Sequence, residues 1–459
     1  MRTAFAAVSA VMLCVATLGA QEKGAPRDPR PADRAARMDE VVTAYAKDNG
    51  FMGSVLVVDG DTVLLNKGYG MASLEWNQPN APVVKFRLGS LTKQFTAALV
   101  LLLQQDGKLK IEDPVSKYLP EVPAAWAKIT LANLLGHTSG IPNFTNEKDF
   151  GAWASSEHTH AEELARITAK PLEFEPGSKF EYSNSNYEVL GMVIEKVSGK
   201  TYESQLHERL LDPLGMTDTG LDSDTLVLPK RAQGYMRDHG KLVVARSESL
   251  SIPWAAGSMY STTGDLLKWE HGLFGAKVLS EESLKRMTTP GLGDYGLGVF
   301  VRNTEGVRTV VHGGGIEGFN TSLAYVPERR IAVIVLCNMN GVATGPVSDD
   351  LMQVALGRTV MLPPEHKPVP IAKEDLQKFA GVYDLAPGFA LTISVGPDGL
   401  QGAATGQQTL SLMYQGVVAG HPRFYAPGPD AELEFVPDAS GTITSLVLHQ
   451  NGEHPAKKR

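Results

Sequence analysis

Hydrophobic and polar positions along the chain change their period from one region to the next, and each period predicts an element. Two apolar runs lie on either side of Asp59-Gly60 in residues 54–70, SVLVVDGDTVLLNKGYG, which is typical of a β-hairpin. A stretch of strong helix formers at residues 91–105, LTKQFTAALVLLLQQ, precedes an Asp-Gly pair and predicts a helix. Residues 187–199, YEVLGMVIEKVSG, repeat apolar positions with the helical period up to a glycine, where we expect that helix to stop.

The order of these elements indicates the fold class. Two further β-runs, NTSLAYVP and RIAVIVLCN, flank a loop at residues 327–330, and another helix is expected to begin near Met38. The chain therefore begins with strands, continues with helices and returns to strands. This order favours an α+β fold in which one antiparallel sheet is flanked by helices. We predict that this first domain spans residues 37–361.

The pattern changes near residue 362. Residues 362–370, LPPEHKPVP, contain four prolines, which cannot continue a helix or a central strand and therefore predict a stiff linker. Beyond them, short apolar runs alternate with turns rich in glycine, proline and aspartate. This spacing predicts a small all-β domain, either a barrel or a sandwich, at residues 371–459. The total length of 459 residues suits two domains.

The first twenty residues have the layout of a cleaved secretory signal peptide. A short basic start is followed by an apolar run over residues 4–18, and small residues precede Gln21. That run is too short to span a bilayer comfortably. Residues 21–36 are polar and contain three prolines, so we expect a disordered leader there. We predict an exported protein, periplasmic or extracellular, without an integral membrane segment after cleavage.

The composition and charge exclude several classes of binding partner. The formal charge is −8, from 43 lysines and arginines against 51 aspartates and glutamates. Nucleic-acid and anionic-membrane binders need a basic excess, so the charge argues against both. The two cysteines, Cys14 and Cys337, are too few for a disulfide framework or a cysteine-rich zinc site. Neither His158-Thr159-His160 nor the two G-x-G-x-x-G matches has the context of a metal or dinucleotide site, so no metal and no cofactor are predicted.

The sharpest chemical signal lies at the start of the helix predicted at residues 91–105. Ser90 and Lys93 are three residues apart, so both side chains project from one helical face within reach of each other. A serine hydroxyl becomes a nucleophile when a base takes its proton, and a lysine with a lowered pKa is such a base when neutral. The helix N-terminus disfavours charge on Lys93 and presents N–H groups to an oxyanion. An S-x-x-K spacing alone is common by chance.

Two other segments strengthen the case for a catalytic site. Tyr182 and Asn184 are two residues apart in a predicted extended loop, so a phenol and an amide face the same side. Tyr182 is a candidate for exchanging protons with Ser90, and Asn184 for hydrogen-bonding a substrate amide. His312 is followed by three glycines, which predicts a strand that a substrate backbone can approach closely and a second N–H donor to an oxyanion.

These three segments, in this order, resemble the motifs of the serine β-lactamase and penicillin-binding-protein superfamily. The S-x-x-K, Y-x-N and K-T-G motifs of that superfamily correspond to Ser90-Leu91-Thr92-Lys93, Tyr182-Ser183-Asn184 and His312-Gly313-Gly314. The likeness is closest to the class C β-lactamase branch, which also holds D-aminopeptidases, D-alanyl-D-alanine carboxypeptidases and esterases. It extends through LLGHTSGIP, LLDPLGMTDT and YSTTGDLLKW and covers about residues 38–355.

The resemblance implies a role for each matching residue. It implies that Ser90 is the acylated nucleophile and that Lys93 and Tyr182 transfer its protons. It further implies substrate contacts at Asn184, His312, Gly313 and Gly314, and an oxyanion hole formed by the N–H groups of Ser90 and Gly315.

His312 departs from the family pattern at the lysine of K-T-G. A lysine there offers a fixed positive charge to a substrate carboxylate, whereas histidine is mostly neutral near pH 7. The departure shifts the expectation from an efficient β-lactamase to a peptidase or an esterase, and of these a D-amino-acid-directed peptidase is favoured. A class C-like β-lactamase, an esterase, and a non-catalytic binder or sensor of cell-wall peptides or β-lactams are the alternatives. The expected partner in each case is a small molecule or a peptide, and the sequence leaves the oligomeric state open.

Overall fold

The structure, a computed structural model, describes residues 34–459 apart from 49, 239–240, 246–247, 305, 343, 363–367, 387–388, 398, 406–408, 427–430 and 450–452. The predicted signal peptide, most of the predicted leader and the centre of the predicted linker lie outside the described residues. Helix α1 (Arg34–Asp48) begins before Met38 and includes residues 34–36, which were expected in the leader. Its first turn is held because Arg34 donates to Asp59 Oδ2 (2.8 Å) and to the Ala355 carbonyl (2.7 Å).

The helices lie mainly in the middle of the chain, as the sequence predicts. The α-helices after α1 are α2 (Thr92–Gln105), α3 (Leu131–Leu135), α4 (Phe150–Trp153), α5 (His160–Thr168), α6 (Asn184–Ser198), α7 (Tyr202–Leu206), α8 (Asp212–Leu214), α9 (Trp254–Gly257), α10 (Thr263–Phe274), α11 (Glu281–Met287), α12 (Thr344–Ala355) and α13 (Lys373–Leu376). Shorter helical turns are η2 (Gly89–Leu91), η3 (Val115–Lys117), η4 (Ala124–Trp126), η5 (Phe144–Asn146), η6 (His207–Leu211), η7 (Leu292–Asp294) and η9 (Gln377–Phe379).

The strands fall into two groups along the chain. Those of the first domain are β1 (Gly53–Asp59), β2 (Thr62–Tyr69), β3 (Met71–Ser73), β4 (Gln78–Pro79), β5 (Phe86–Arg87), β6 (Gly220–Leu221), β7 (Tyr235–Asp238), β8 (Lys241–Val244), β9 (Met259–Ser261), β10 (Phe300–Thr304), β11 (Val307–Ile316), β12 (Phe319–Val326) and β13 (Ile331–Cys337). Those near the C-terminus are β14 (Gly381–Ala386), β15 (Phe389–Gly396), β16 (Gly399–Ala404), β17 (Leu410–Ser411), β18 (Met413–Val418), β19 (His421–Ala426), β20 (Ala431–Pro437), β21 (Ile443–His449) and β22 (Glu453–Lys458).

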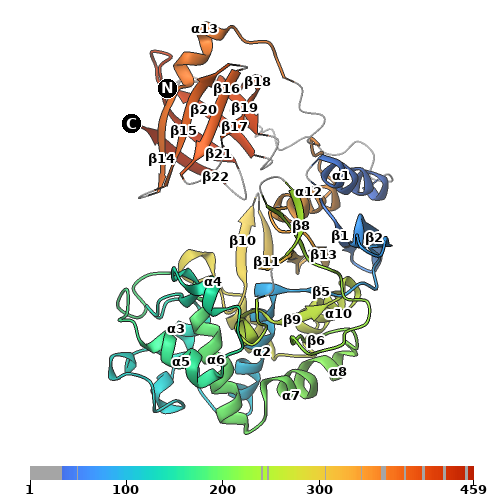
Figure 1. Ribbon diagram of the computed structural model, residues 1–459, viewed down its shortest axis with the longest axis vertical. Coiled ribbons are helices and arrows are strands. Elements are labelled where there is room, and N and C mark those ends of the chain that lie inside the picture. Colours follow the sequence, from blue (N-terminus) through green and yellow to red (C-terminus); the bar gives the residue numbers. More distant parts are fainter. Residues whose placement is uncertain are drawn as a thin grey trace, which may run out of the picture.

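A six-stranded antiparallel sheet forms the centre of the first domain, with the order β10-β11-β12-β13-β1-β2 (Figure 1). The hairpin predicted at residues 54–70 is β1–β2, and the two late runs are β12 and β13. First and last segments of the domain therefore pair with each other, since Val55 on β1 faces Val335 on β13. The predicted α+β fold with one antiparallel sheet is confirmed.

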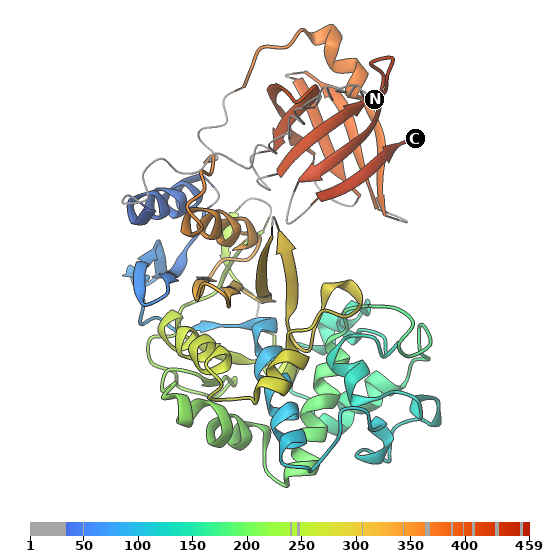
Figure 2. The ribbon, with the colours of Figure 1, turned by 180° about the vertical axis from the view of Figure 1, so that it is seen from behind.

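Helices cover both faces of this sheet, which explains why its central strands are apolar without alternation. On β1, Val55 and Val57 belong to the hydrophobic cluster that includes α1 and α12, whereas Leu56 and Val58 belong to the cluster around α2. Helices α1 and α12 lie side by side on their face, as both views show (Figure 2). Free Cys337 is fully buried in the hydrophobic cluster that includes α1, where it packs as a small apolar residue.

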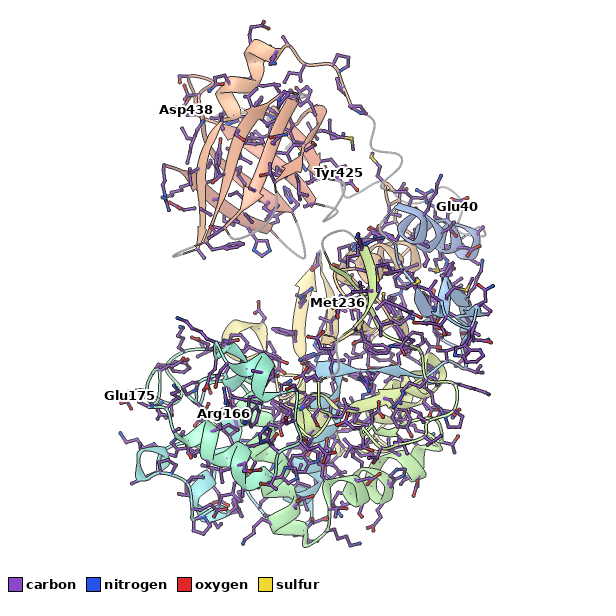
Figure 3. The ribbon with its side chains drawn as sticks, in the orientation of Figure 1. Glu40, Arg166, Glu175, Met236, Tyr425 and Asp438 are labelled. Atoms are coloured by element: carbon purple, nitrogen blue, oxygen red, sulfur yellow. The ribbon has the colours of Figure 1, made fainter. Side chains whose placement is uncertain are left out.

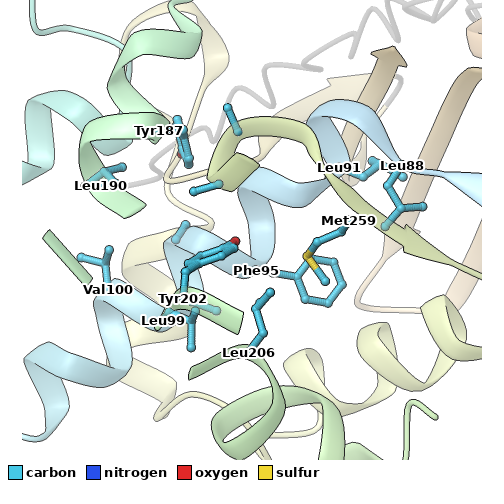
Figure 4. Close-up of a cluster of buried hydrophobic side chains, with 14 of the residues drawn as sticks. Leu88, Leu91, Phe95, Leu99, Val100, Tyr187, Leu190, Tyr202, Leu206 and Met259 are labelled. Atoms are coloured by element: carbon cyan, nitrogen blue, oxygen red, sulfur yellow. The ribbon is translucent and has the colours of Figure 1, made fainter. Parts of the chain in front are cut away.

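Helix α2 is buried on nearly all sides and runs through the larger cluster. Its Phe95 and Leu99 side chains lie beside Tyr202 and Leu206 of α7 (Figure 4). Burial on nearly all sides explains the continuous apolar run at residues 97–103, and it gives the start of α2 a rigid base.

The C-terminal strands form a separate unit with its own core. Strands β14–β22 pair antiparallel in the order β17-β16-β15-β14-β22-β21-β20-β19-β18 and are coloured orange to red in Figure 1. Aromatic residues such as Phe379, Phe424 and Phe435 pack in the interior. The predicted all-β character of this region is confirmed. Between residues 34 and 459, no helix that the structure describes has the length and apolarity needed to cross a membrane.

Candidate active site

A cavity of about 450 Å³ opens beside the N-terminal end of α2. Three residues predicted to act at one site, Ser90, Asn184 and Gly315, line it together, although they are far apart in the sequence. Met236, labelled in Figure 3, is also part of the wall. The other lining residues are Gly89, Phe144, Thr145, Phe150, Glu248, Ile252, Pro253, Ala256, Gly257, Ile316, Glu317 and Asn340.

Ser90 lies in the single turn η2 immediately before α2. The turn packs tightly on β11, because a Cβ atom added to Gly89 would lie 2.8 Å from the Gly315 nitrogen, and Gly89 has φ +56°. The backbone just before this turn also lies close to β11 at Gly314, where an added Cβ atom would be 2.0 Å from the Leu88 carbonyl oxygen. The glycines after His312 thus leave the space in which the turn that carries Ser90 packs against β11. Gly315 lines the same cavity as Ser90.

We expect Gly314→Ala to slow covalent labelling of Ser90 by a fluorophosphonate about a hundredfold. The added methyl group cannot fit against the Leu88 carbonyl, so the turn must shift, and a displacement of about 1 Å costs this much in a positioned reaction. Gly313→Ala is the matched control, because its added Cβ atom would meet its nearest neighbour, the Thr321 carbonyl, at 3.5 Å. Equal labelling rates in the two variants would contradict the packing argument.

Lys93 is fully buried one helical turn after Ser90, and its amine has three partners. Nζ donates to Ser90 Oγ (3.0 Å), to Asn184 Oδ1 (2.8 Å) and to the Ala256 carbonyl (2.8 Å). Burial lowers the pKa of Lys93 to about 7, while the charge of Glu188 acts in the opposite direction. A large part of the amine is therefore neutral near pH 7 and able to accept the Ser90 proton.

Asn184 is the first residue of α6, so the Y-x-N segment lies at a helix start rather than wholly within a loop. Ser183 has the extended backbone of a residue that precedes a helix. The Asn184 side chain bridges two parts of the cavity, since Oδ1 accepts from Lys93 and Nδ2 donates to Thr145 Oγ1 (3.2 Å). Asn184 therefore orients the amine of Lys93 as well as lining the cavity.

The Tyr182 ring lies against the amine of Lys93, with Nζ 5.0 Å from the ring centroid. Its hydroxyl is buried and has no hydrogen bond of normal geometry among the described residues. Burial raises the pKa of Tyr182, and the nearby Ser90 hydroxyl opposes that shift. The phenol consequently keeps its proton at neutral pH, which suits it to donate rather than to accept.

His137 supports the Tyr182 ring from behind, with the two ring centroids 4.2 Å apart. It has φ +54°, and its Nδ1 accepts from the Ser183 backbone N–H (3.2 Å), so it stabilises the turn before α6. Burial, followed by the charge of Lys93, lowers the pKa of His137 well below its usual value. The imidazole is therefore a neutral packing and hydrogen-bonding group.

The structure places His312 differently from the expectation that it faces a substrate carboxylate. Its side chain is 2% exposed and is not among the residues that line the cavity. Nε2 pairs with the Tyr295 hydroxyl (3.0 Å) and Nδ1 with the Gly313 carbonyl (2.6 Å). Burial lowers the pKa of His312 to about 3, and the charge of Lys93 adds to this shift. The imidazole is thus neutral, so lowering the pH toward 6 does not supply the missing charge.

Two acidic residues at the cavity were not singled out from the sequence. Glu248 follows β8 in a loop, and Glu317 lies in the turn between β11 and β12, two residues after Gly315. Burial, followed by the charge of Glu317, raises the pKa of Glu248 to about 7. Nothing in the local pattern distinguishes them from surface glutamates, although the spacing from Gly315 was a usable signal for Glu317. Within the described part of the chain, no three His, Cys, Asp or Glu side chains are grouped so as to hold a metal ion.

Comparison with known proteins agrees with the motifs. The family model described as Beta-lactamase matches residues 13–356. The chain belongs to this family. It therefore lies in the serine β-lactamase and penicillin-binding-protein superfamily that the three segments resemble. The "Putative penicillin-binding protein PbpX" of Bacillus subtilis (strain 168) is 32% identical over 318 residues, which cover 69% of this chain and 78% of that protein.

Solved structures of similar proteins share the fold of this Beta-lactamase family member. The octameric penicillin-binding protein homologue from Pyrococcus abyssi has a TM-score of 0.67 and 25% identity, covering 92% of this chain and 99% of that chain. A D-stereospecific amidohydrolase from Streptomyces sp. has a TM-score of 0.60 and 27% identity, covering 70% of this chain and 98% of that chain. Proteins of this fold family are generally hydrolytic.

Proposed function

We propose that this protein is an exported serine hydrolase that forms an acyl-enzyme at Ser90 and acts as a D-amino-acid-directed peptidase. The observation that carries the proposal is the hydrogen bond between Lys93 Nζ and Ser90 Oγ (3.0 Å) at the edge of a cavity. A buried amine with a lowered pKa next to a serine hydroxyl is an arrangement that generates an alkoxide nucleophile. A pure receptor for cell-wall peptides has no need of such a base.

The steps of the proposed reaction follow from the positions of the side chains. Neutral Lys93 takes the Ser90 proton while Oγ attacks the substrate carbonyl carbon, and the N–H groups of Ser90 and Gly315 bind the oxyanion. Tyr182, which keeps its proton, passes it to the leaving nitrogen and regains a proton from Lys93. A water molecule then attacks the ester through the same two residues, which releases the acid and restores the Ser90 hydroxyl.

The charge of the cavity supports a substrate with a free amino group. Glu248 and Glu317 are both in the wall, whereas none of the described residues that line the cavity is lysine, arginine or histidine. A carboxylate, as in a β-lactam or a peptide C-terminus, would meet negative charge there, and an ammonium group would be attracted. The D-stereospecific amidohydrolase among the structural relatives supports an amide of D configuration as the substrate.

D-phenylalanine p-nitroanilide should be hydrolysed with a kcat/KM about tenfold to a hundredfold higher than its N-acetyl derivative. This range corresponds to loss of one charge-assisted hydrogen bond, about 1.5–3 kcal/mol. Glu317→Gln should reduce the preference, mainly through KM, while leaving hydrolysis of the N-acetyl compound nearly unchanged. Initial rates of both compounds on both proteins test this, with L-phenylalanine p-nitroanilide as the control for the D configuration.

The same assay separates the alternatives. Nitrocefin turnover above that of the anilides would indicate a β-lactamase, and turnover of p-nitrophenyl acetate alone would indicate an esterase. If no substrate is hydrolysed and mass spectrometry detects no fluorophosphonate adduct on Ser90, the protein is a binder and the proposed hydrolase is wrong.

A further inference from the structure

A pair of glutamates is buried behind Lys93, on the side away from the cavity. Glu188 lies on α6, four residues after Asn184 and therefore on the same helical face one turn deeper, and Glu163 lies on α5. Both side chains are fully buried. Neither lines the cavity, and the proposed reaction uses neither. Burying an ionised carboxyl group costs folding free energy unless the group is protonated or paired, so the presence of two buried glutamates needs an explanation.

Glu188 is linked to Lys93 through a single residue of α9. Its Oε1 accepts from the Ala256 backbone N–H (3.2 Å), and the Ala256 carbonyl accepts from Lys93 Nζ (2.8 Å). The adjacent Ala255 carbonyl is held by Thr96 Oγ1 of α2 (2.7 Å). Glu188 thus fixes the backbone that presents one of the three hydrogen-bond acceptors of the Lys93 amine.

The other three carboxyl oxygens of the pair are poorly partnered. Glu188 Oε2 and both oxygens of Glu163 are buried without a hydrogen bond of normal geometry. Burial raises the pKa of both groups, and the charge of Glu163 raises that of Glu188 further. Two adjacent buried carboxylates repel each other, so the pair retains a proton at neutral pH. The Nδ1 atom of His160, a partly exposed residue, lies 3.6 Å from Glu163 Oε2 and connects the pair to the surface.

We propose that Glu188 is a positioning residue for the catalytic base: it anchors the backbone N–H of Ala256, the residue whose carbonyl accepts from Lys93, and the protonation of the Glu188–Glu163 pair determines how much negative charge faces the Lys93 amine. This inference rests on the proposed function, because it assigns Lys93 the role of base. Glu188 is the group whose charge opposes the lowering of the Lys93 pKa by burial.

The other titratable groups around Lys93 do not compete with this effect at neutral pH. Burial raises the pKa values of the tyrosines and lowers those of the histidines, which leaves all of them uncharged. These groups are Tyr182 before α6, Tyr187 on α6, His137 in the turn after α3, and His312 on β11. Among the described residues that act on Lys93, Glu188 therefore supplies the variable charge.

Two conservative variants should move the pH profile in opposite directions. Glu188→Gln keeps an oxygen for the Ala256 N–H but removes the charge, so Lys93 loses its proton more easily and the acidic limb of kcat/KM shifts to lower pH by about one unit. Glu163→Gln removes the neighbouring carboxyl group whose charge raises the pKa of Glu188 and replaces it with an amide, so Glu188 carries more negative charge and the limb shifts to higher pH. A purely structural role would not produce shifts of opposite sign.

The measurement is kcat/KM for D-phenylalanine p-nitroanilide from pH 5 to 9, on wild type and both variants, with thermal melts as a check of folding. Opposite shifts support the proposal. Unchanged limbs, or shifts in the same direction, overturn it while leaving the hydrolase intact, because wild-type turnover is measured in the same series. If Glu188→Gln does not fold, Glu163→Gln must still move the limb upward, and its failure to do so overturns the proposal. A wild type without turnover or Ser90 labelling indicates instead that the proposed function itself is wrong.

Discussion

Ser90→Ala should reduce kcat by at least about four orders of magnitude, with no measurable change in the melting temperature. The variant removes only the hydroxyl oxygen, and Ser90 is partly exposed at the cavity, so little packing is lost. Without Oγ no acyl-enzyme forms, and the oxyanion donors and the cavity alone give only residual catalysis. The assay is hydrolysis of D-phenylalanine p-nitroanilide together with intact-protein mass spectrometry after treatment with a fluorophosphonate.

The matched control is Ser156→Ala, because Ser156 is exposed and remote in sequence from the three motifs. It should retain wild-type turnover and the adduct mass. If Ser90→Ala keeps more than a tenth of wild-type kcat, another group attacks the substrate and the acyl-enzyme mechanism is incorrect. If Ser90→Ala loses both turnover and cooperative melting, the loss of activity reflects misfolding. Labelling of the Ser90→Cys variant by a thiol reagent then shows whether the side chain at this position faces the cavity.

The fold could be predicted from the sequence because apolar runs and turn residues, which are local patterns, determine its main elements. The β1–β2 hairpin combines two apolar runs with an Asp-Gly turn, and α2 is an apolar run that ends at another Asp-Gly pair. The sheet could be inferred as antiparallel from strands at both ends of the domain. The start of α1 was placed too late, because Arg34 is tied to Asp59 and to the Ala355 carbonyl, both far away in the sequence. Local composition cannot reveal such an anchor.

The candidate site could be predicted where the spacing of residues along a helix determines the positions of their side chains. Ser90 and Lys93 occupy one helical face, and the structure brings them within hydrogen-bond distance. His312 was interpreted from its place in a motif, but its environment is set by Tyr295 and the Gly313 carbonyl. A motif gives the position of a residue on a strand, whereas the direction of its side chain and its pKa depend on neighbours from other segments.

The residues that the sequence did not indicate share one property, which is that their chemistry arises from tertiary burial. Glu188 and Glu163 have unremarkable helical surroundings in the sequence, yet they meet behind Lys93. Glu248 had no usable signal in the sequence, because the loop that carries it enters the cavity only in the folded chain.

Lys93→Met should reduce kcat by about three to five orders of magnitude and abolish the acidic limb of the pH profile. Methionine has nearly the shape of the lysine stem, so the buried volume is kept while the base is lost. In wild type the active form has a neutral amine. Since burial lowers the pKa of Lys93 to about 7, kcat/KM should rise with pH and level off above neutrality.

Lys93→Arg distinguishes a base from a fixed charge. A guanidinium keeps the positive charge and can still donate hydrogen bonds to Asn184 Oδ1 or the Ala256 carbonyl, but it does not lose its proton in this pH range. We therefore expect the arginine variant to be as inactive as the methionine variant, and its residual rate to show no limb near pH 7. Stopped-flow measurement of p-nitroaniline release would locate the defect in acylation, because the nucleophile is never deprotonated. Substantial activity in Lys93→Arg would mean that Lys93 acts through its charge alone, and proton removal from Ser90 would then have to be assigned to another group.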